Sequence, residues 1–167
     1  MGDLGTTEFA TVLLVFRVLF GVVFASHGIA KAKSLDGTAG WFDSIGMKPG
    51  AFHARAAAGT EIGTGLLLAL GLLTPLAAAG IVAVMIVAGW TVHAKNGFGM
   101  VNDGWEYTFV VAITALLLAG LGPGEYSLDA LIGMDETLNG WSGIAISAGV
   151  GVAAGIGQIV IFFRPAD

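Results

Sequence analysis

Six side chains within or beside the long apolar stretches of this sequence are candidates for chemistry, because each can carry a charge: Arg17, His27, Lys31, Glu61, His93 and Glu106. If those stretches lie in a membrane, each ionised group near the bilayer centre costs about 2.5 to 3.5 kcal/mol. Each group therefore needs a partner or a function. The chemistry open to this set is ion pairing, proton transfer, and hydrogen bonding to a polar ligand.

The composition indicates that the apolar stretches do lie in a membrane. Of 167 residues, 56% are hydrophobic and 11% are charged, and the mean hydropathy is +0.86. We infer an integral membrane protein whose first partner is the lipid bilayer. A net charge of -5 without a basic stripe excludes nucleic acid as a partner. The lack of cysteine excludes disulfides, iron–sulfur ligation and thiol catalysis by this chain, and no metal site is expected.

Five apolar segments can form helices that span a bilayer, whose core of about 30 Å needs about 20 residues. They cover residues 9–31, 54–73, 76–93, 104–121 and 141–163. Thr74 can cap the third helix and Pro75 can open it, while the turn-rich "GPGEYSLD" ends the fourth. The sequence therefore predicts an all-α, polytopic membrane helix bundle, with residues 1–167 in a single transmembrane domain.

The distribution of Lys and Arg predicts the orientation of the bundle. The loop over 32–53 with its helix ends, the loop after the third helix and the C-terminal tail hold six of the seven, whereas the N-terminal tail and the 122–140 loop hold none. By the positive-inside rule we expect a multi-pass protein of the plasma (inner) membrane with its N-terminus outside and its C-terminus in the cytoplasm. The acidic opening "MGDLGTTE" does not resemble a signal peptide.

Arg17 and Glu61 are the two charges expected deepest in the membrane. At 1.5 Å per residue they lie about 12 Å and about 18 Å below the outer surface. Because the first two spans are sequential and antiparallel, we expect them to be neighbours and Arg17 to pair with Glu61. Such a pair could be a functional site or could only fix the register of the two helices.

The other four charged or titratable groups are expected near the cytoplasmic side. One helix face carries Arg17, Gly21, Phe24, Gly28 and Lys31, with His27 at its edge. His27 and His93 lie at a matched depth, so they could hydrogen-bond a quinone carbonyl or ligate haem iron, or simply bond to backbone or lipid. Only the matched depth supports haem, so we do not expect it. Glu106 could bind a ligand, or could close a helix cap begun by Asp103.

Three further patterns have mainly structural interpretations. Small residues four apart, at Gly59 and Gly63 and at 147, 151 and 155, predict close helix packing. Aromatic residues near the cytoplasmic side predict an interfacial belt, although a quinone ring could stack there: Trp41, Trp90, Trp105 and Tyr107. The acidic residues of the 122–140 loop predict a solvated loop or a docking surface: Glu125, Asp129, Asp135 and Glu136.

Taken in order, several motifs over residues 13–132 resemble the DoxX family of small membrane proteins. They are "FRVLFGVVFASHGIAK", "GWFDSIGMKP", "AAAGTEIGTGLLLALGLLTPLAA", "VHAKNGF" and "GPGEYSLDAL". The resemblance implies a four-helix membrane bundle, to which the fifth helix, ending "FFRPAD", adds an extension like that of actinobacterial-type members. The family positions matched here are Arg17, His27, Gly28, Lys31, Glu61, Gly65 and His93.

The resemblance also implies a functional setting. The related DoxD proteins form part of a thiosulfate:quinone oxidoreductase, and a mycobacterial member is linked with superoxide dismutase and a sulfurtransferase in a membrane-associated complex. We therefore expect an accessory subunit of a redox or respiratory oxidoreductase complex, with protein partners and with a polar interior that could bind a quinone-like lipid. No cofactor motif is evident, and we do not expect an enzyme that acts alone. The alternative is a small solute transporter or proton-relay protein.

Overall fold

The computed structural model describes residues 5–165, and the regular elements within that range are helices. The five long ones are α1 (Thr6–Ala32), α3 (Gly50–Leu70), α4 (Thr74–Ala88), α5 (Glu106–Leu121) and α7 (Gly140–Phe162). Two shorter helices, α2 (Leu35–Ser44) and α6 (Leu128–Leu131), lie in the connections. An all-α fold is confirmed. The acidic opening segment lies partly outside the described residues, at 1–4.

Each of the five predicted segments contains one long helix, and the bounds agree to within a few residues. Three helical stretches are long and apolar enough to cross a membrane: Thr6–Ala32, Thr74–Asn96 and Gly140–Phe162. Helix α5 is apolar but has only 16 residues. The membrane character of the bundle is therefore supported by these three helices, and a full set of five spans stays a prediction.

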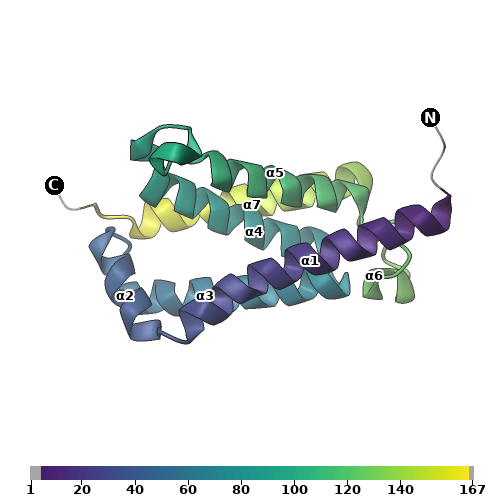
Figure 1. Ribbon diagram of the computed structural model, residues 1–167, viewed down its shortest axis with the longest axis horizontal. Coiled ribbons are helices and arrows are strands. Elements are labelled where there is room, and N and C mark those ends of the chain that lie inside the picture. The colour runs from purple at the N-terminus through teal and green to yellow at the C-terminus, as the bar shows by residue number, and fades with distance from the viewer. Residues whose placement is uncertain (1–4, 166–167) are drawn as a thin grey trace.

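The long helices form two layers. Helices α1 and α3 pack side by side in one layer, and α4, α5 and α7 pack together in the other (Figure 1). Successive long helices alternate in direction, so α1 begins at one end of the molecule and α7 finishes at the opposite end. Helix α2 closes the end where α7 finishes, and α6 lies at the other end.

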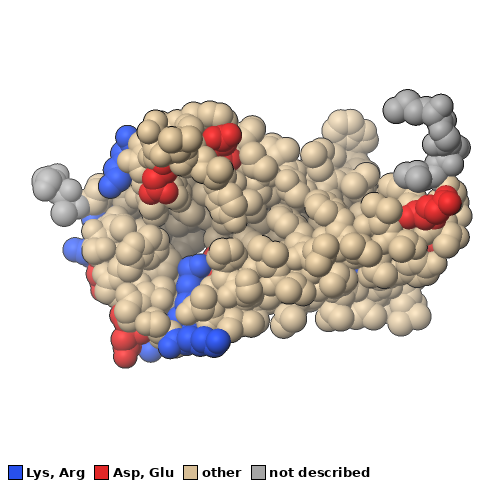
Figure 2. Space-filling view, viewed as in Figure 1, with Lys and Arg blue, Asp and Glu red and all other residues tan. Residues whose placement is uncertain are grey.

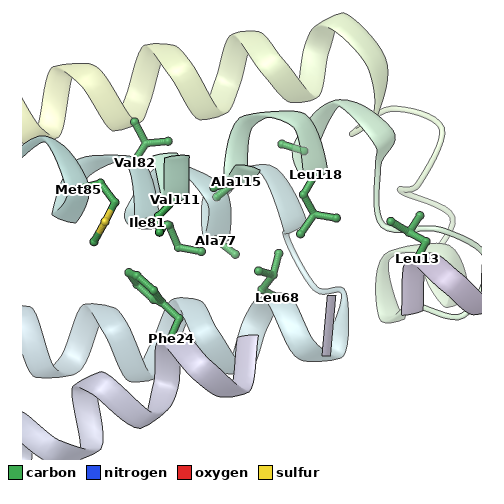
Figure 3. Close-up of a cluster of buried hydrophobic side chains, with 12 residues drawn as sticks. Leu13, Phe24, Leu68, Ala77, Ile81, Val82, Met85, Val111, Ala115 and Leu118 are labelled. Atoms are coloured by element: carbon green, nitrogen blue, oxygen red, sulfur yellow. The ribbon is translucent and has the colours of Figure 1, made fainter. Parts of the chain in front are cut away.

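An apolar core fills the space between the layers (Figure 3). Leu68 of α3, Ile81 of α4 and Leu118 of α5 are completely buried. Burying a leucine or isoleucine side chain in a well-packed core stabilises a fold by about 1.5 to 3 kcal/mol in water-based estimates, and in a bilayer the packing itself supplies most of the gain. At one end of this core, Phe24 and Met85 point toward one another from α1 and α4.

Glycines set the closest helix contacts. A methyl group added at Gly65 would lie 2.5 Å from the carbonyl oxygen of Gly21, and one added at Gly28 would lie 2.7 Å from that of Ala58. Gly151 and Gly155 of α7 are packed in the same way against α4, as predicted. The prediction for Gly59 and Gly63 is wrong for this chain's own fold, because both have open space within 4 Å of an added methyl.

A distant carboxylate organises the turn between α3 and α4. Asp129 accepts hydrogen bonds from the Leu73 amide at 2.8 Å and from both the amide and the hydroxyl of Thr74 at 3.0 Å. Leu73 is held in a left-handed conformation, with φ at 49°. Thr74 is thus the first residue of α4, and the group that caps this helix comes from Asp129, not from Thr74 as predicted. Pro75 lies in the first turn, as predicted. Asp129 is fully buried, so it is not part of an exposed acidic surface.

Candidate ligand cavity

A cavity of about 380 Å³ lies between the two helix layers, toward the end closed by α2. All five long helices and α2 contribute to its wall. The space-filling view is hollowed on the left, between α2 and the loop before α5, and basic side chains lie along the lower side of this hollow (Figure 2). Most of the wall is alanine, valine and aromatic side chain, and the polar groups are few.

The central polar feature of the cavity is an ion pair between Lys31 and Glu61. The ammonium of Lys31 lies 2.9 Å and 2.7 Å from the two carboxylate oxygens of Glu61. The Glu61 side chain is 4% exposed and that of Lys31 is 27% exposed. The charges therefore belong to one partly desolvated pair that faces an apolar space.

The predicted pairing of Glu61 with Arg17 is wrong, and the helix register gives the reason. Gly21 lies opposite Gly65 and Gly28 opposite Ala58, which puts Glu61 near the level of Ala25. Side chains on a helix lean toward its N-terminus. In this antiparallel pair Glu61 and Lys31 lean toward each other, whereas Arg17 leans away.

Arg17 instead anchors a loop at the opposite end of the bundle. It is 1% exposed, and its guanidinium donates to the carbonyl oxygens of Pro123 and, at 2.6 Å, of Tyr126. Arg17 therefore has the geometry of a structural tie between α1 and the 122–132 segment, and it does not line the cavity.

Both predicted histidines line the cavity, in different settings. His27 lies on the exposed edge of α1. His93 ends a π-helical turn, Gly89–His93, that continues α4 and also brings Thr91 to the cavity wall. Nδ1 of His93 lies 2.8 Å from the carbonyl oxygen of Asp103. Because a carbonyl oxygen can only accept a hydrogen bond, Nδ1 carries the hydrogen, and Nε2 is left for another partner. Such π-helical turns occur frequently at functional sites.

Glu106 is the first residue of α5, and its side chain bonds back to the loop that precedes this helix. Its carboxylate accepts a hydrogen bond from the Met100 amide at 2.8 Å, and the residue at the N-cap position is Trp105. The predicted cap pairing of Glu106 with Asp103 is therefore replaced by a bond to an earlier turn of the loop. Glu106 does not line the cavity.

The sequence interpretation did not single out Gln158 at the cavity wall or the buried His53 beside it. Gln158 of α7 lines the cavity, and its amide nitrogen lies 2.9 Å from Nδ1 of His53, which is fully buried. Rings of Phe42, Phe52 and Phe162 surround the His53 imidazole, whose Nε2 has no hydrogen-bond partner among the described residues. His53 lies just before the predicted second span and Gln158 lies in a span without charge, so neither belongs to the pattern of deep charges in the sequence.

The arrangement offers hydrogen-bond donors around an apolar space. Within residues 5–165, no three His, Asp or Glu side chains gather closely enough to hold a metal ion. Lys31 has three N–H donors, of which two are directed at Glu61, so one remains for a ligand. Tyr107 and His93 add further polar groups at the wall. This combination suits a mostly apolar ligand that presents an acceptor oxygen.

The fold and the cavity together define a helical membrane protein with a polar group of side chains at one end of its interior. Comparison with known proteins supplies the family: residues 12–94 match the DoxX family model. That region contains most of α1, all of α2 to α4, and with them Lys31, Glu61 and both cavity histidines. The chain belongs to the DoxX family.

Three relatives carry names that bear on this assignment. "Putative oxidoreductase CatD" of Bacillus subtilis is 33% identical over 75% of this chain and 88% of its own length. "Uncharacterized membrane protein Rv3486" of Mycobacterium tuberculosis is 31% identical over 77% and 85%. "Inner membrane protein YqjF" of Escherichia coli is 28% identical over 72% and 91%. No solved structure matches the chain.

Proposed function

We propose that this protein is an accessory subunit of a membrane-bound redox complex and that it binds a quinone-like lipid head group in the cavity. One observation carries the proposal: the Lys31–Glu61 pair, with the carboxylate buried, lies at the wall of a mostly apolar cavity of about 380 Å³. That volume lies within the range of about 300 to 1,000 Å³ typical of small-molecule sites.

The geometry gives the pair a binding role. Glu61 holds the ammonium of Lys31 through two hydrogen bonds, so the remaining N–H of Lys31 has a fixed direction and can donate to a carbonyl oxygen of the ring. A ring carbonyl is an acceptor only, which matches the donors available from the Lys31 ammonium, the Tyr107 phenol and the His27 imidazole. The apolar wall accommodates the faces of the ring.

The accessory role rests on what the chain carries and on one relative. Without cysteine or a dinucleotide-binding motif, the chain has no group of its own that stores electrons. A bound quinone would accept electrons from a partner subunit. The name of the Bacillus subtilis relative refers to oxidoreductase activity, which supports a redox setting for this chain as well.

The same proposal includes the topology. We place the protein in the plasma (inner) membrane, with five spans, the N-terminus outside and the C-terminus in the cytoplasm. The name of the Escherichia coli relative supports the membrane, and the basic side chains visible at the α2 end of the molecule support the orientation (Figure 2). The cavity then opens near the cytoplasmic side.

Extraction of bound lipid tests the binding role. The protein is purified from its native membranes in mild detergent, and quinone per polypeptide is measured by mass spectrometry. We expect quinone with the wild type and with Glu136→Gln, an exposed control at the far end, and its loss from Lys31→Met/Glu61→Leu. Equal quinone in all three proteins, or none in the wild type, contradicts the proposal.

Separation of intact membrane complexes tests the accessory role. On a native gel of membranes solubilised in mild detergent, we expect the chain to migrate in a larger assembly whose other subunits include a redox enzyme. Migration of the chain only by itself, with full quinone binding, would contradict the accessory role and leave the quinone site standing.

The alternative is a transporter or a proton relay, which the buried Lys31–Glu61 pair favours because buried charges can bind ions or transfer protons. The apolar core of the bundle argues against a relay. The Lys31–Glu61 pair and the buried Arg17 are separated by about 20 Å along α1, and the core between them is built mainly of apolar side chains (Figure 3). A relay would need a chain of polar groups across that distance. Proton flux through purified protein in liposomes would favour this alternative over quinone binding.

A further inference from the structure

A second hollow, the α4–α5 groove, lies against the cavity. It has a volume of about 360 Å³, and its wall is almost entirely apolar, with Trp90, Trp105, Phe109 and Ala112 among its residues. Met85 and Thr108 line both the groove and the cavity. These two side chains therefore form a shared part of the wall between the cavity and the apolar groove.

The residues at this boundary differ in how freely their side chains can move. Gly89 has no side chain, and a methyl group added there would lie 2.9 Å from the Thr108 hydroxyl, so α4 and α5 are closely spaced at this point by small residues. Met85 is unbranched and adapts its shape readily. Thr108 is tied to its own helix by a hydrogen bond to the Trp105 carbonyl at 2.8 Å. Met85 is accordingly the side chain that can move.

The groove has the character expected of a site for a hydrocarbon chain. Trp90, Trp105 and Phe109 are 62%, 37% and 48% exposed, so flat apolar surface is available along its length. From Trp105 to Ala112 it follows α5 for about 10 Å. It begins at the level of the predicted aromatic belt and continues toward the bilayer interior, which is the direction a lipid tail takes from its head group.

We propose that the cavity and the α4–α5 groove form one site for a two-part lipid, with the ring in the cavity, the hydrocarbon tail in the groove, and Met85 as the movable side chain between them. This rests on the proposed function for the ring position and adds the class of ligand: a quinone with a long isoprenoid tail that enters sideways from the bilayer. A tail-less ring would use only half of the site.

A tail-length comparison tests the site. The full-length protein in nanodiscs is titrated with methyl-naphthoquinone and with the same ring bearing a long isoprenoid tail, and quenching of tryptophan fluorescence reports binding. Trp41 lines the cavity and Trp90 and Trp105 line the groove, so quenching has reporters at both parts. Ala112→Phe fills the groove, and Val110→Phe places the same ring on the exposed face of the same helix as a matched control.

We expect Ala112→Phe to weaken binding of the tailed quinone about tenfold relative to Val110→Phe and to leave the tail-less ring within twofold. Each probe is compared between the two variants, so the partition of that probe into the nanodisc lipid is the same in both measurements. If Ala112→Phe leaves the binding of both probes unchanged, or weakens both equally, the groove is not the tail site, and the ring site in the cavity still stands. Failure of both probes to bind the wild type overturns the proposed function and the groove together.

Discussion

Lys31 and Glu61 share one ion pair unequally, because the carboxylate is almost completely buried and the ammonium is about one-quarter exposed. Removing one member of a buried pair costs more than removing both, since a lone buried charge keeps its desolvation cost and loses its partner. Removal of Lys31 therefore leaves the buried Glu61 carboxylate without a compensating charge, whereas removal of Glu61 leaves an ammonium that water can reach. The pair can be tested for stability separately from ligand binding.

We expect Lys31→Met to destabilise the bundle by about 3 kcal/mol and Lys31→Met/Glu61→Leu to recover most of that loss. The midpoint of thermal unfolding in detergent, followed by tryptophan fluorescence, measures both variants. A double variant less stable than Lys31→Met would show that Glu61 has other stabilising partners.

Arg17 makes a different prediction because it binds two backbone carbonyls at once. Lysine carries the same charge but lacks the planar fork that reaches both Pro123 and Tyr126. We expect Arg17→Lys to lower the unfolding midpoint, at a cost of about 1 to 3 kcal/mol, and to leave quinone binding by the intact protein unchanged. A stable Arg17→Lys protein that no longer binds quinone would place Arg17 in the ligand site.

The sequence predicted which residues form the buried face of α1 and missed which charges meet. Gly21, Phe24 and Gly28 are buried on one face with Arg17, as the spacing indicates. The partner of Glu61 depended on the register of α1 against α3 and on the lean of each side chain. The depth of a residue along its helix gives neither the register nor the lean of the side chains. The sequence therefore predicted Arg17 as the partner of Glu61, whereas the partner is Lys31.

At the scale of the helices, contact between backbones makes glycine positions unequal. Gly21 lies where a methyl group would meet the carbonyl of Gly65, whereas Gly59 lies in open space. We expect Gly21→Ala to lower the thermal unfolding midpoint clearly, and Gly59→Ala on the neighbouring helix to leave it unchanged or slightly raised, because alanine also favours the helix. Equal effects would mean that α1 and α3 do not pack as described.

A lowered midpoint for Gly59→Ala alone would point instead to a contact outside this chain. The two variants exchange the same atoms in the same type of helix, so their difference isolates the close approach of α1 and α3.

The helices were predictable because each apolar segment ends at recognisable turn chemistry, as at "GLLTP" before α4. The cap of α4 was not. Asp129 lies 55 residues from Thr74 in sequence, and only the folded loop brings its carboxylate to the start of that helix. Similarly, the bond from Met100 to Glu106 depends on a loop whose turns the sequence does not specify.

For the whole molecule, the proposed orientation is open to a direct labelling test. The chain has no cysteine, so a single introduced cysteine is the only thiol that a maleimide can modify. We expect a membrane-impermeant maleimide to label Glu136→Cys in intact cells and to label Lys33→Cys only after the cells are opened. Labelling of Lys33→Cys in intact cells would reverse the orientation and move the cavity to the outer side.

The cavity is a property of the whole bundle, since six helices contribute to its wall. The sequence placed His27, Lys31 and His93 near the cytoplasmic face and Glu61 deeper in the membrane, and the fold brings these four to one cavity. The sequence could not predict that Gln158 lines the cavity or that Glu106 does not, because both outcomes depend on how α7 and the loop before α5 pack.

The central claim is that the cavity beside Lys31 and Glu61 holds a quinone ring. Photo-crosslinking with an azido-naphthoquinone in nanodiscs, followed by mass spectrometry of peptides, tests it most directly. We predict modified residues on the cavity faces of α1, α3 and α4, competed by unlabelled naphthoquinone and lost in Lys31→Met/Glu61→Leu. Labelling spread over the lipid-facing helix surfaces, with no competition and no effect of the double variant, would contradict the account.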